Sequence, residues 1–202
     1  MKIGFHNSIE EISKNEWNSL LNDINYPFLK HDFLQLLENT NCVGAKTGWI
    51  PLHITVSKDN SLLAAMPLYL KSHSQGEFVF DHSWANAFYQ HGLDYYPKLV
   101  SSIPHTPASG PRFLIKEGEN KKELFEMIKE GVKNIAAKNN ISSWHILFPM
   151  EEEVDFYDDS NLSIRKNAQF IWFNKNFESF EDYISSFSCL LYTSPSPRDA
   201  IP

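Results

Sequence analysis

The sequence predicts an α+β fold in which a central, mostly antiparallel sheet is flanked by helices. Three observations support this prediction. Apolar residues alternate with polar ones along residues 52–56, as in a half-buried strand, and they recur at helical spacing between Asn120 and Lys138. Strand and helix patterns are mixed along the rest of the chain, and we find neither an internal repeat nor a Gly/Ser-rich linker. We therefore expect most of the 202 residues to form one domain.

Residues 1–40 are expected to form a short strand followed by two helices. Ser13 and Glu16 have the spacing of a capping box, in which each side chain satisfies a backbone amide at the helix start. Pro27 suits the first turn of the second helix. The faces predicted to pack on the sheet are Trp17, Leu20, Leu21 and Ile24 in the first helix and Leu29, Phe33, Leu36 and Leu37 in the second.

A β-hairpin is expected between Trp49 and Lys71, with the polar turn at residues 58–61. Prolines exclude a helix between Pro104 and Pro111. Asn120 caps the predicted helix that runs to about Lys138. The remaining predicted elements are strands at 99–100, 112–115, 144–148 and 169–173, a solvated helix that begins with Glu151, Glu152 and Glu153, and a helix that begins at Ser179.

Composition excludes several classes of protein. The net charge is −7, from 18 basic and 25 acidic residues, which disfavours a broad phosphate-binding face for nucleic acid. The longest apolar runs are too short to span a membrane. The start of the chain lacks the apolar core of a signal peptide, and Cys42 and Cys189 are too few for a disulfide framework, so we expect a cytoplasmic protein. The histidines lack metal-ligand spacing, so no metal is expected.

The last residues form an anomaly. After Ser188 the helical pattern gives way to a Pro- and Ser-containing string that resembles the translation of sequencing-adapter read-through. We expect residues 1–187 to be the folded module and residues 188–202 to be an artefactual or disordered tail. The alternative is an ordinary C-terminal loop.

Residues 76–112 hold most of the residues suited to chemistry. Aromatic side chains are frequent from Phe78 to Tyr96 and are interspersed with Asp81, His82, His91 and Asp94. Such a composition is typical of a ligand cleft, and also of an aromatic core. Both interpretations remain open at this stage.

Several strings in this order resemble the N-terminal half of the FemAB-like, GNAT-related peptidoglycan biosynthesis/recognition proteins, over about Ser8 to Phe187. The strings are Trp17-Asn18, Pro27-Phe28-Leu29, Phe33-Leu34, Leu37-Glu38, Gly48-Trp49, Pro67 to Lys71, residues 76–85, 95–99 and 104–112, and Gln169 to Trp172. The resemblance implies a GNAT-like acyltransferase fold, and a chain truncated after the first of two modules, so that a C-terminal module of the same chain would be a partner.

The resemblance also implies a function, which is N-acyl or aminoacyl transfer to an amine, with a peptidoglycan precursor or another small molecule as substrate. GNAT-type domains hold the donor where two central strands part and free backbone amides for its carbonyl. The donor would be acyl-CoA or another acyl compound. A non-catalytic module that recognises a cell-wall or peptide-like ligand is the alternative, and a purely structural module is a third.

Attack by an amine needs a base for the ammonium proton and an acid for the leaving group, and the candidate residues are assigned to these roles. Asp81 is the candidate base or amine-orienting carboxylate, because it follows an apolar stretch expected to be a strand and precedes a predicted helix; capping that helix is its alternative role. His82 is a candidate proton relay and Tyr96 a candidate leaving-group acid, against structural roles for both. The candidate substrate-binding residues are Trp84, Tyr95, Lys98, His105, Thr106, Gly110 and Arg112. For Lys98 and Arg112 the alternative is a solvated surface charge, and Phe170 and Trp172 are expected in the core.

Coenzyme A binding by this module lacks sequence support. The phosphate-cradle signature of acetyl-CoA-using GNAT enzymes is absent, and Lys116-Glu117-Gly118-Glu119-Asn120 occupies the comparable position between a strand and a helix. Two carboxylates there would repel a pyrophosphate.

Overall fold

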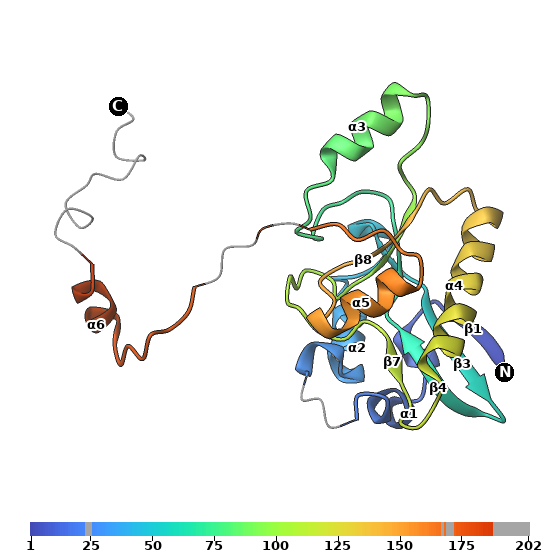
Figure 1. Ribbon diagram of the computed structural model, residues 1–202, viewed down its shortest axis with the longest axis horizontal. Coiled ribbons are helices and arrows are strands. Elements are labelled where there is room, and N and C mark those ends of the chain that lie inside the picture. Colours follow the sequence, from blue (N-terminus) through green and yellow to red (C-terminus); the bar gives the residue numbers. More distant parts are fainter. Residues whose placement is uncertain (23–25, 167, 169–171, 188–202) are drawn as a thin grey trace. The chain divides into compact units, whose positions relative to one another are not determined.

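The computed structural model describes residues 1–22, 26–166, 168 and 172–187. The chain divides into two compact units, Met1–Ile164 and Arg165–Pro202. The strand predicted at 169–173 falls mostly outside the described residues, and so does the whole tail from 188 to 202. Most helices and strands of the first unit are labelled in Figure 1.

The first unit contains two four-stranded sheets. One has the order β1 (Lys2–His6), β3 (His53–Lys58), β4 (Ser61–Met66) and β7 (Leu114–Ile115). The other has the order β2 (Trp49–Pro51), β5 (Tyr69–Lys71), β6 (Lys98–Ser101) and β8 (Trp144–Ile146). Within the described residues, every strand pair is antiparallel except β6 with β8, which is parallel. The predicted mostly antiparallel arrangement is confirmed.

The division into two sheets has a local cause. β4 and β5 follow one another with only Pro67 and Leu68 between them. Proline has no N–H to donate to a ladder, so the strand is interrupted there. Leu52 between β2 and β3 donates its N–H to the Leu68 carbonyl at 2.9 Å, which keeps the two interrupted strands side by side.

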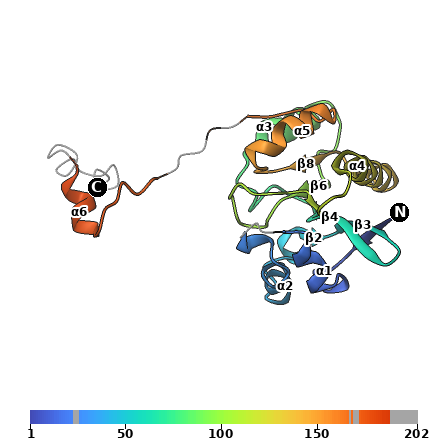
Figure 2. The same cartoon turned by 60° about the horizontal axis from the view of Figure 1, so that its bottom comes forward.

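Helices cover both faces of the sheets, as Figure 2 shows. The helices of this unit are α1 (Lys14–Ser19), α2 (His31–Asn39), α3 (His82–Gln90), α4 (Lys121–Lys138) and α5 (Glu151–Asp159), with 3-10 turns at Ile9–Glu11, Pro27–Leu29 and Ala45–Thr47. Trp17 and Leu34 belong to the core under α1 and α2, whereas Phe125 and Ile128 belong to the core under α4 and α5. Because the sheet is covered twice, His53 and Thr55 are buried as well as Ile54 and Val56.

Local signals located most elements correctly. The hairpin turn is formed by Asp59 and Asn60, both with positive φ (50° and 61°), between the paired residues Lys58 and Ser61. The Asn120 side chain accepts from the Glu123 N–H and so caps α4. In the second unit, α6 (Phe180–Ser185) is capped by Ser179, whose side chain accepts from the Asp182 N–H.

Tertiary contacts changed four predictions. Ser13 caps α1, but the Glu16 carboxylate accepts from the Leu62 N–H on β4 at 3.1 Å, which makes it a link to the sheet. The residues from Pro27 form a 3-10 turn, and α2 begins only at His31. Leu36 is 58% exposed, whereas His31 and Leu34 are the buried residues of that helix, so the buried face differs from the predicted one. Glu153 is buried, which contradicts the solvated start predicted for α5.

Candidate functional site

Two buried lysines face each other across the central strands of the second sheet. Lys71 on β5 pairs with Lys98 on β6, and neither side chain is exposed. A buried ammonium is stable only where acceptors surround it. The Lys98 ammonium donates to Glu77 Oε2 at 2.8 Å, to Asp81 Oδ2 at 2.5 Å and to Ser74 Oγ at 2.8 Å. The surface-charge alternative for Lys98 is therefore wrong.

Asp81 is held by three donors. Its Oδ2 accepts from Lys98, from the Ser74 hydroxyl at 2.9 Å and from the Tyr95 hydroxyl at 2.8 Å. Burial by itself raises the pKa of Asp81, but the bonds from Lys98, Ser74 and Tyr95 outweigh burial and lower the pKa. Asp81 stands at the N-cap position of α3, yet among the described residues its carboxylate makes no capping bond. Asp81 is thus an ionised carboxylate inside the cluster.

Glu77 shares Lys98 with Asp81, but its pKa is shifted in the opposite direction. Burial raises the pKa of Glu77, and the bond from Lys98 offsets this only in part. Within the described part of the chain, Glu77 Oε1 and Asp81 Oδ1 are buried and have no hydrogen-bond partner. Two carboxylates with pKa values shifted in opposite directions beside one ammonium form an acid–base pair. Sequence reasoning missed Glu77, and the neighbouring string Phe78-Val79-Phe80 gave no signal of its burial, because Phe78 and Phe80 are themselves exposed.

Lys71 completes the cluster and was also missed. Its ammonium donates to the Gln75 carbonyl at 3.0 Å and lies 3.7 Å from the centre of the Trp49 ring. Burial lowers the pKa of Lys71 to about 8. Its amine therefore loses its proton more easily than an ordinary lysine does.

The segment between the two lysines carries the remaining residues of the cluster. The Tyr96 hydroxyl lies 2.7 Å from Ser74 Oγ. Residues 78–80 do not form the predicted strand, and Phe78 and Phe80 are exposed. Figure 1 shows α3 projecting from the body of this unit. The aromatic segment is therefore divided, with Tyr95 buried and its other rings largely at the surface.

The other predicted residues lie outside the Lys98 cluster. His82 and Trp84 are exposed on α3, and Trp84 retains 52% of its surface. The His105 Nε2 atom lies 3.1 Å from the Cys42 carbonyl, and the Thr106 hydroxyl donates to the Pro104 carbonyl at 3.0 Å. The Thr106 contact lies within its own loop, and the His105 contact reaches the loop that follows α2. Both are with backbone carbonyls, which is typical of structural side chains.

Gly110 allows a close approach to its backbone, but the group that approaches is the Tyr26 ring of the protein and not a ligand. A Cβ atom at this position would lie 2.3 Å from the Tyr26 ring. The Tyr26 hydroxyl donates to the Ala108 carbonyl at 3.1 Å, which holds the ring against the glycine. The small residue is therefore needed for packing of the loop that precedes β7.

Arg112 is fully buried and binds carbonyl groups instead of a ligand. Its guanidinium donates to the carbonyls of Leu147 at 2.8 Å, Ala108 at 2.7 Å and Pro111 at 3.2 Å. The surface-charge alternative is wrong for this residue too, and the structure does not bring Arg112 into the Lys98 cluster. Its backbone N–H donates to Glu153 of α5.

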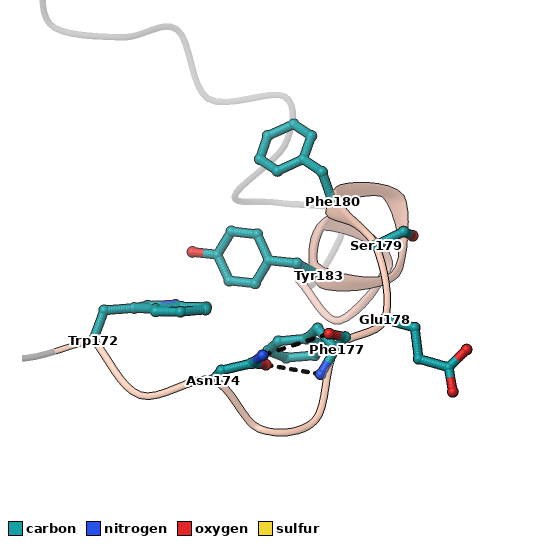
Figure 3. A pocket seen from close by; sticks show the side chains of 7 residues that line it. All are labelled: Trp172, Asn174, Phe177, Glu178, Ser179, Phe180 and Tyr183. Carbon is teal, nitrogen blue, oxygen red and sulfur yellow. Dashed lines mark hydrogen bonds between the residues drawn. The ribbon is translucent and has the colours of Figure 1, made fainter.

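A hollow of about 370 Å³ lies in the second unit (Figure 3). Its lining is Trp172, Asn174, Phe177, Glu178, Ser179, Phe180 and Tyr183. Trp172 is 60% exposed, which contradicts its predicted core position, and Phe170 lies outside the described residues. None of the predicted catalytic or substrate-binding residues lines this hollow, so we do not assign the reaction to it.

Two searches give negative results for the part of the chain that the structure describes. No group of three or more His, Cys, Asp and Glu side chains is arranged to hold a metal ion. No helix is both long and apolar enough to cross a membrane.

Comparison with known proteins gives a family and a fold. The family model described as peptidoglycan biosynthesis/recognition, FemAB-like, matches residues 8–190. No curated protein matches the sequence. A ribosomal-protein-alanine N-acetyltransferase from Brucella melitensis biovar Abortus 2308 is 12% identical, with a TM-score of 0.51, over 85% of this chain and 98% of its own.

Two further solved structures are similar. A Bacillus halodurans protein is 9% identical, with a TM-score of 0.50, over 86% of this chain and 100% of its own. An aminoglycoside 6'-N-acetyltransferase from Acinetobacter haemolyticus is 12% identical, with a TM-score of 0.49, over 88% of this chain and 100% of its own. At such identities the two structures with TM-scores of 0.51 and 0.50 establish the fold alone, and the predicted GNAT-like fold is confirmed.

Proposed function

The chain belongs to the FemAB-like family, and from this premise we propose that it takes part in N-acyl transfer to an amine of a peptidoglycan precursor. The first unit would supply the site for the acceptor amine. The observation that carries this proposal is the pair of buried oxygens, Glu77 Oε1 and Asp81 Oδ1, which lack a donor within the described residues. Buried acceptors without a donor are rare and need an explanation. A ligand ammonium would supply the missing N–H groups.

The two carboxylates suit two different tasks. An acceptor amine arrives as an ammonium ion at neutral pH and must lose a proton before its lone pair attacks an acyl carbonyl. Asp81, with its lowered pKa, stays ionised and would orient the ammonium. Glu77, with its raised pKa, would accept the proton as the N–C bond forms. The Tyr96 hydroxyl, bonded to Ser74, would protonate the leaving group.

Access to this site requires the segment from Ser74 to Asp81, which itself carries both carboxylates, to move relative to Lys98, because Glu77, Asp81 and Lys98 are all buried. Two features of the segment favour movement. Phe78 has a positive φ of 58°, a conformation that is strained for an aromatic residue. Its side chain is 56% exposed, so the Phe78 ring itself adds little packing that would resist a change. The segment would then close over the bound amine.

Coenzyme A is the acyl donor that the fold family implies, and the described residues do not fit it. Glu117 and Glu119 are exposed in the loop before α4, where a pyrophosphate would need positive charge or free amides. The backbone amides of Arg112 and Phe113, beside the parted strands, are already bonded to Glu153. We therefore assign only the acceptor side of the reaction to this unit.

The Glu153 contacts also favour a second candidate, a module that recognises the amine without catalysis. In that case the carboxylates of Glu77 and Asp81 bind the ligand amine, and no proton transfer through Glu77 is needed. The two candidates make different predictions for the Glu77→Gln variant. A recognition module would lose affinity only, whereas a transferase would lose turnover beyond its loss of affinity.

The test uses the full chain and a peptidoglycan stem peptide that carries a free side-chain amine, with the Nε-acetylated peptide as ligand control. We expect calorimetric binding of the free amine and at least about tenfold weaker binding of the acetylated form, because an amide cannot supply a charged donor. Asp81→Asn and Glu77→Gln should weaken binding by a similar factor. Asp94→Asn, at an exposed carboxylate next to Tyr95, should leave it unchanged. Equal binding of both peptides, or full affinity in Asp81→Asn, would refute the amine site.

A further inference from the structure

The parallel strands β6 and β8 separate after a short paired stretch. Their register joins Leu99 with Trp144 and Ser101 with Ile146. The Leu147 N–H still donates to the Ser101 carbonyl at 3.0 Å. The next residue, Phe148, is bonded elsewhere, because its carbonyl accepts from the N–H of Gly110, which lies nine residues after Ser101. Residues 102–113 thus leave the sheet of β6 and β8, and the chain then joins the other sheet at β7. The Arg112 guanidinium joins the two segments, because it donates to the Leu147 carbonyl at 2.8 Å.

One carboxylate lies against the backbone just before β7. Glu153 of α5 is 6% exposed, and its oxygens accept from the Arg112 N–H at 3.1 Å, the Phe113 N–H at 3.4 Å, the Met150 N–H at 3.4 Å and the Tyr157 hydroxyl at 3.2 Å. None of these four donors carries a charge. Burial raises the pKa of Glu153 in spite of the bonds to backbone amides. Burying the ionised carboxylate at this position therefore costs free energy, which the uncharged donors offset only in part.

The donors come from three separate places in the chain. Arg112 and Phe113 precede β7, Met150 precedes α5, and Tyr157 lies one turn further along α5 and is 3% exposed. Phe156 stacks on Phe113, at 6.3 Å between ring centres and 5° between ring planes, which fixes α5 against these amides. Donors that converge from different elements on one buried acceptor form a site for an oxygen anion.

We propose that the amides of Arg112 and Phe113 and the hydroxyl of Tyr157 form a carboxylate-binding site, which this chain fills with its own Glu153. While Glu153 accepts from these amides, they are not free to bind the carbonyl of an acyl thioester. An emptied site would accept a small free carboxylate. Glu153→Ala removes one methylene and the carboxylate, which together match acetate in size. This proposal is independent of the amine site at Asp81 and Glu77.

The test compares the melting temperature of full-length Glu153→Ala in sodium acetate and in sodium chloride at equal ionic strength. Acetate should raise the melting temperature of this variant by about 3 °C or more, in a saturable manner. Recovery of folded protein only in acetate would also support the site. The matched control is Glu152→Ala, at an exposed carboxylate of the same helix, which acetate should not stabilise. Equal effects of acetate on the two variants would overturn the proposal.

Amide hydrogen exchange provides a second measurement. It uses the Glu153→Gln variant, so it does not depend on whether Glu153→Ala folds. Glu153→Gln keeps an oxygen acceptor and leaves no room for acetate, so Arg112 and Phe113 should remain protected and acetate should have no effect. Fast exchange of the Arg112 and Phe113 amides in Glu153→Gln, with the rest of the unit protected, would show that the side chain at position 153 does not hold these amides, and it would overturn the proposal. Saturable binding of acetyl-CoA to the wild-type chain with added protection at Arg112 and Phe113 would likewise overturn the proposal.

Discussion

At the scale of single residues, the charged side chains buried in the centre of the first unit are compensated locally. Lys98 has three acceptors, Arg112 has three carbonyls, and Glu153 has amides and a hydroxyl. Burying such groups costs more than it gains unless every partner is present. The loss of one partner should therefore lower the free energy of unfolding substantially.

Lys98→Met is expected to lower the free energy of unfolding by about 3–5 kcal/mol, because Glu77 and Asp81 would remain buried without their shared ammonium. Urea denaturation followed by circular dichroism measures the change. The control is Lys133→Met on α4, whose ammonium is 75% exposed beside Glu130 and should cost less than about 1 kcal/mol. Similar losses in both variants would argue against the buried cluster as a source of stability.

At the scale of elements, Glu38 on α2 joins three parts of the fold. Its carboxylate accepts from the Ser8 hydroxyl at 2.6 Å and the Ile9 N–H at 3.1 Å, and it lies 3.1 Å from Nε2 of His53 on β3. Burial would raise the pKa of Glu38, but the contacts with His53, Ser8 and Ile9 lower it from its ordinary value of 4.5. The ionised form is thus the one that the fold stabilises.

A carboxyl group with a pKa lowered by folding stabilises the protein above its unfolded pKa and loses this contribution as the pH falls through the folded pKa. Stability should therefore fall below about pH 4.5 in the wild type. In Glu38→Gln, stability at pH 7 should be lower by about 1–3 kcal/mol, and the acid-dependent loss should be smaller. Urea titrations at pH 7 and pH 4 measure both effects. An unchanged pH dependence in the variant would rule out Glu38 as a contributor.

At the scale of the whole molecule, the hydrophobic cores described here lie in the first unit. Their buried members extend from Ile9 to Tyr157, and the last partly buried side chain packed against them is Leu162. The buried polar clusters around Lys98 and Glu153 also lie before residue 164. The second unit is described separately, with α6 and its aromatic hollow.

A fragment of residues 1–164 is therefore expected to fold cooperatively, with a melting temperature within about 5 °C of that of the full chain. Calorimetry and near-ultraviolet circular dichroism test this directly. A fragment without a cooperative transition would mean that residues beyond 164 contribute to the same core.

The sequence by itself determined what depends on neighbouring residues. Asn120 and Ser179 cap helices because the amides they accept from lie three residues away, and Asp59-Asn60 forms the hairpin turn through its own backbone preference. The family resemblance was also readable, since it rests on strings in order, and it supplied the fold. Asp81, Tyr95, Tyr96 and Lys98 were selected as candidates, and the structure places them in one cluster.

Only the tertiary structure decided which charges are buried and what they bind. Glu77 and Lys71 join the cluster because strands β5 and β6 place the two lysines opposite each other, a pairing between residues 27 positions apart. Glu153 reaches Arg112 across 41 positions, so no local pattern distinguishes it from its exposed neighbours Glu151 and Glu152. Burial and charge compensation depend on the sum of long-range contacts, which the order of residues along the chain does not display.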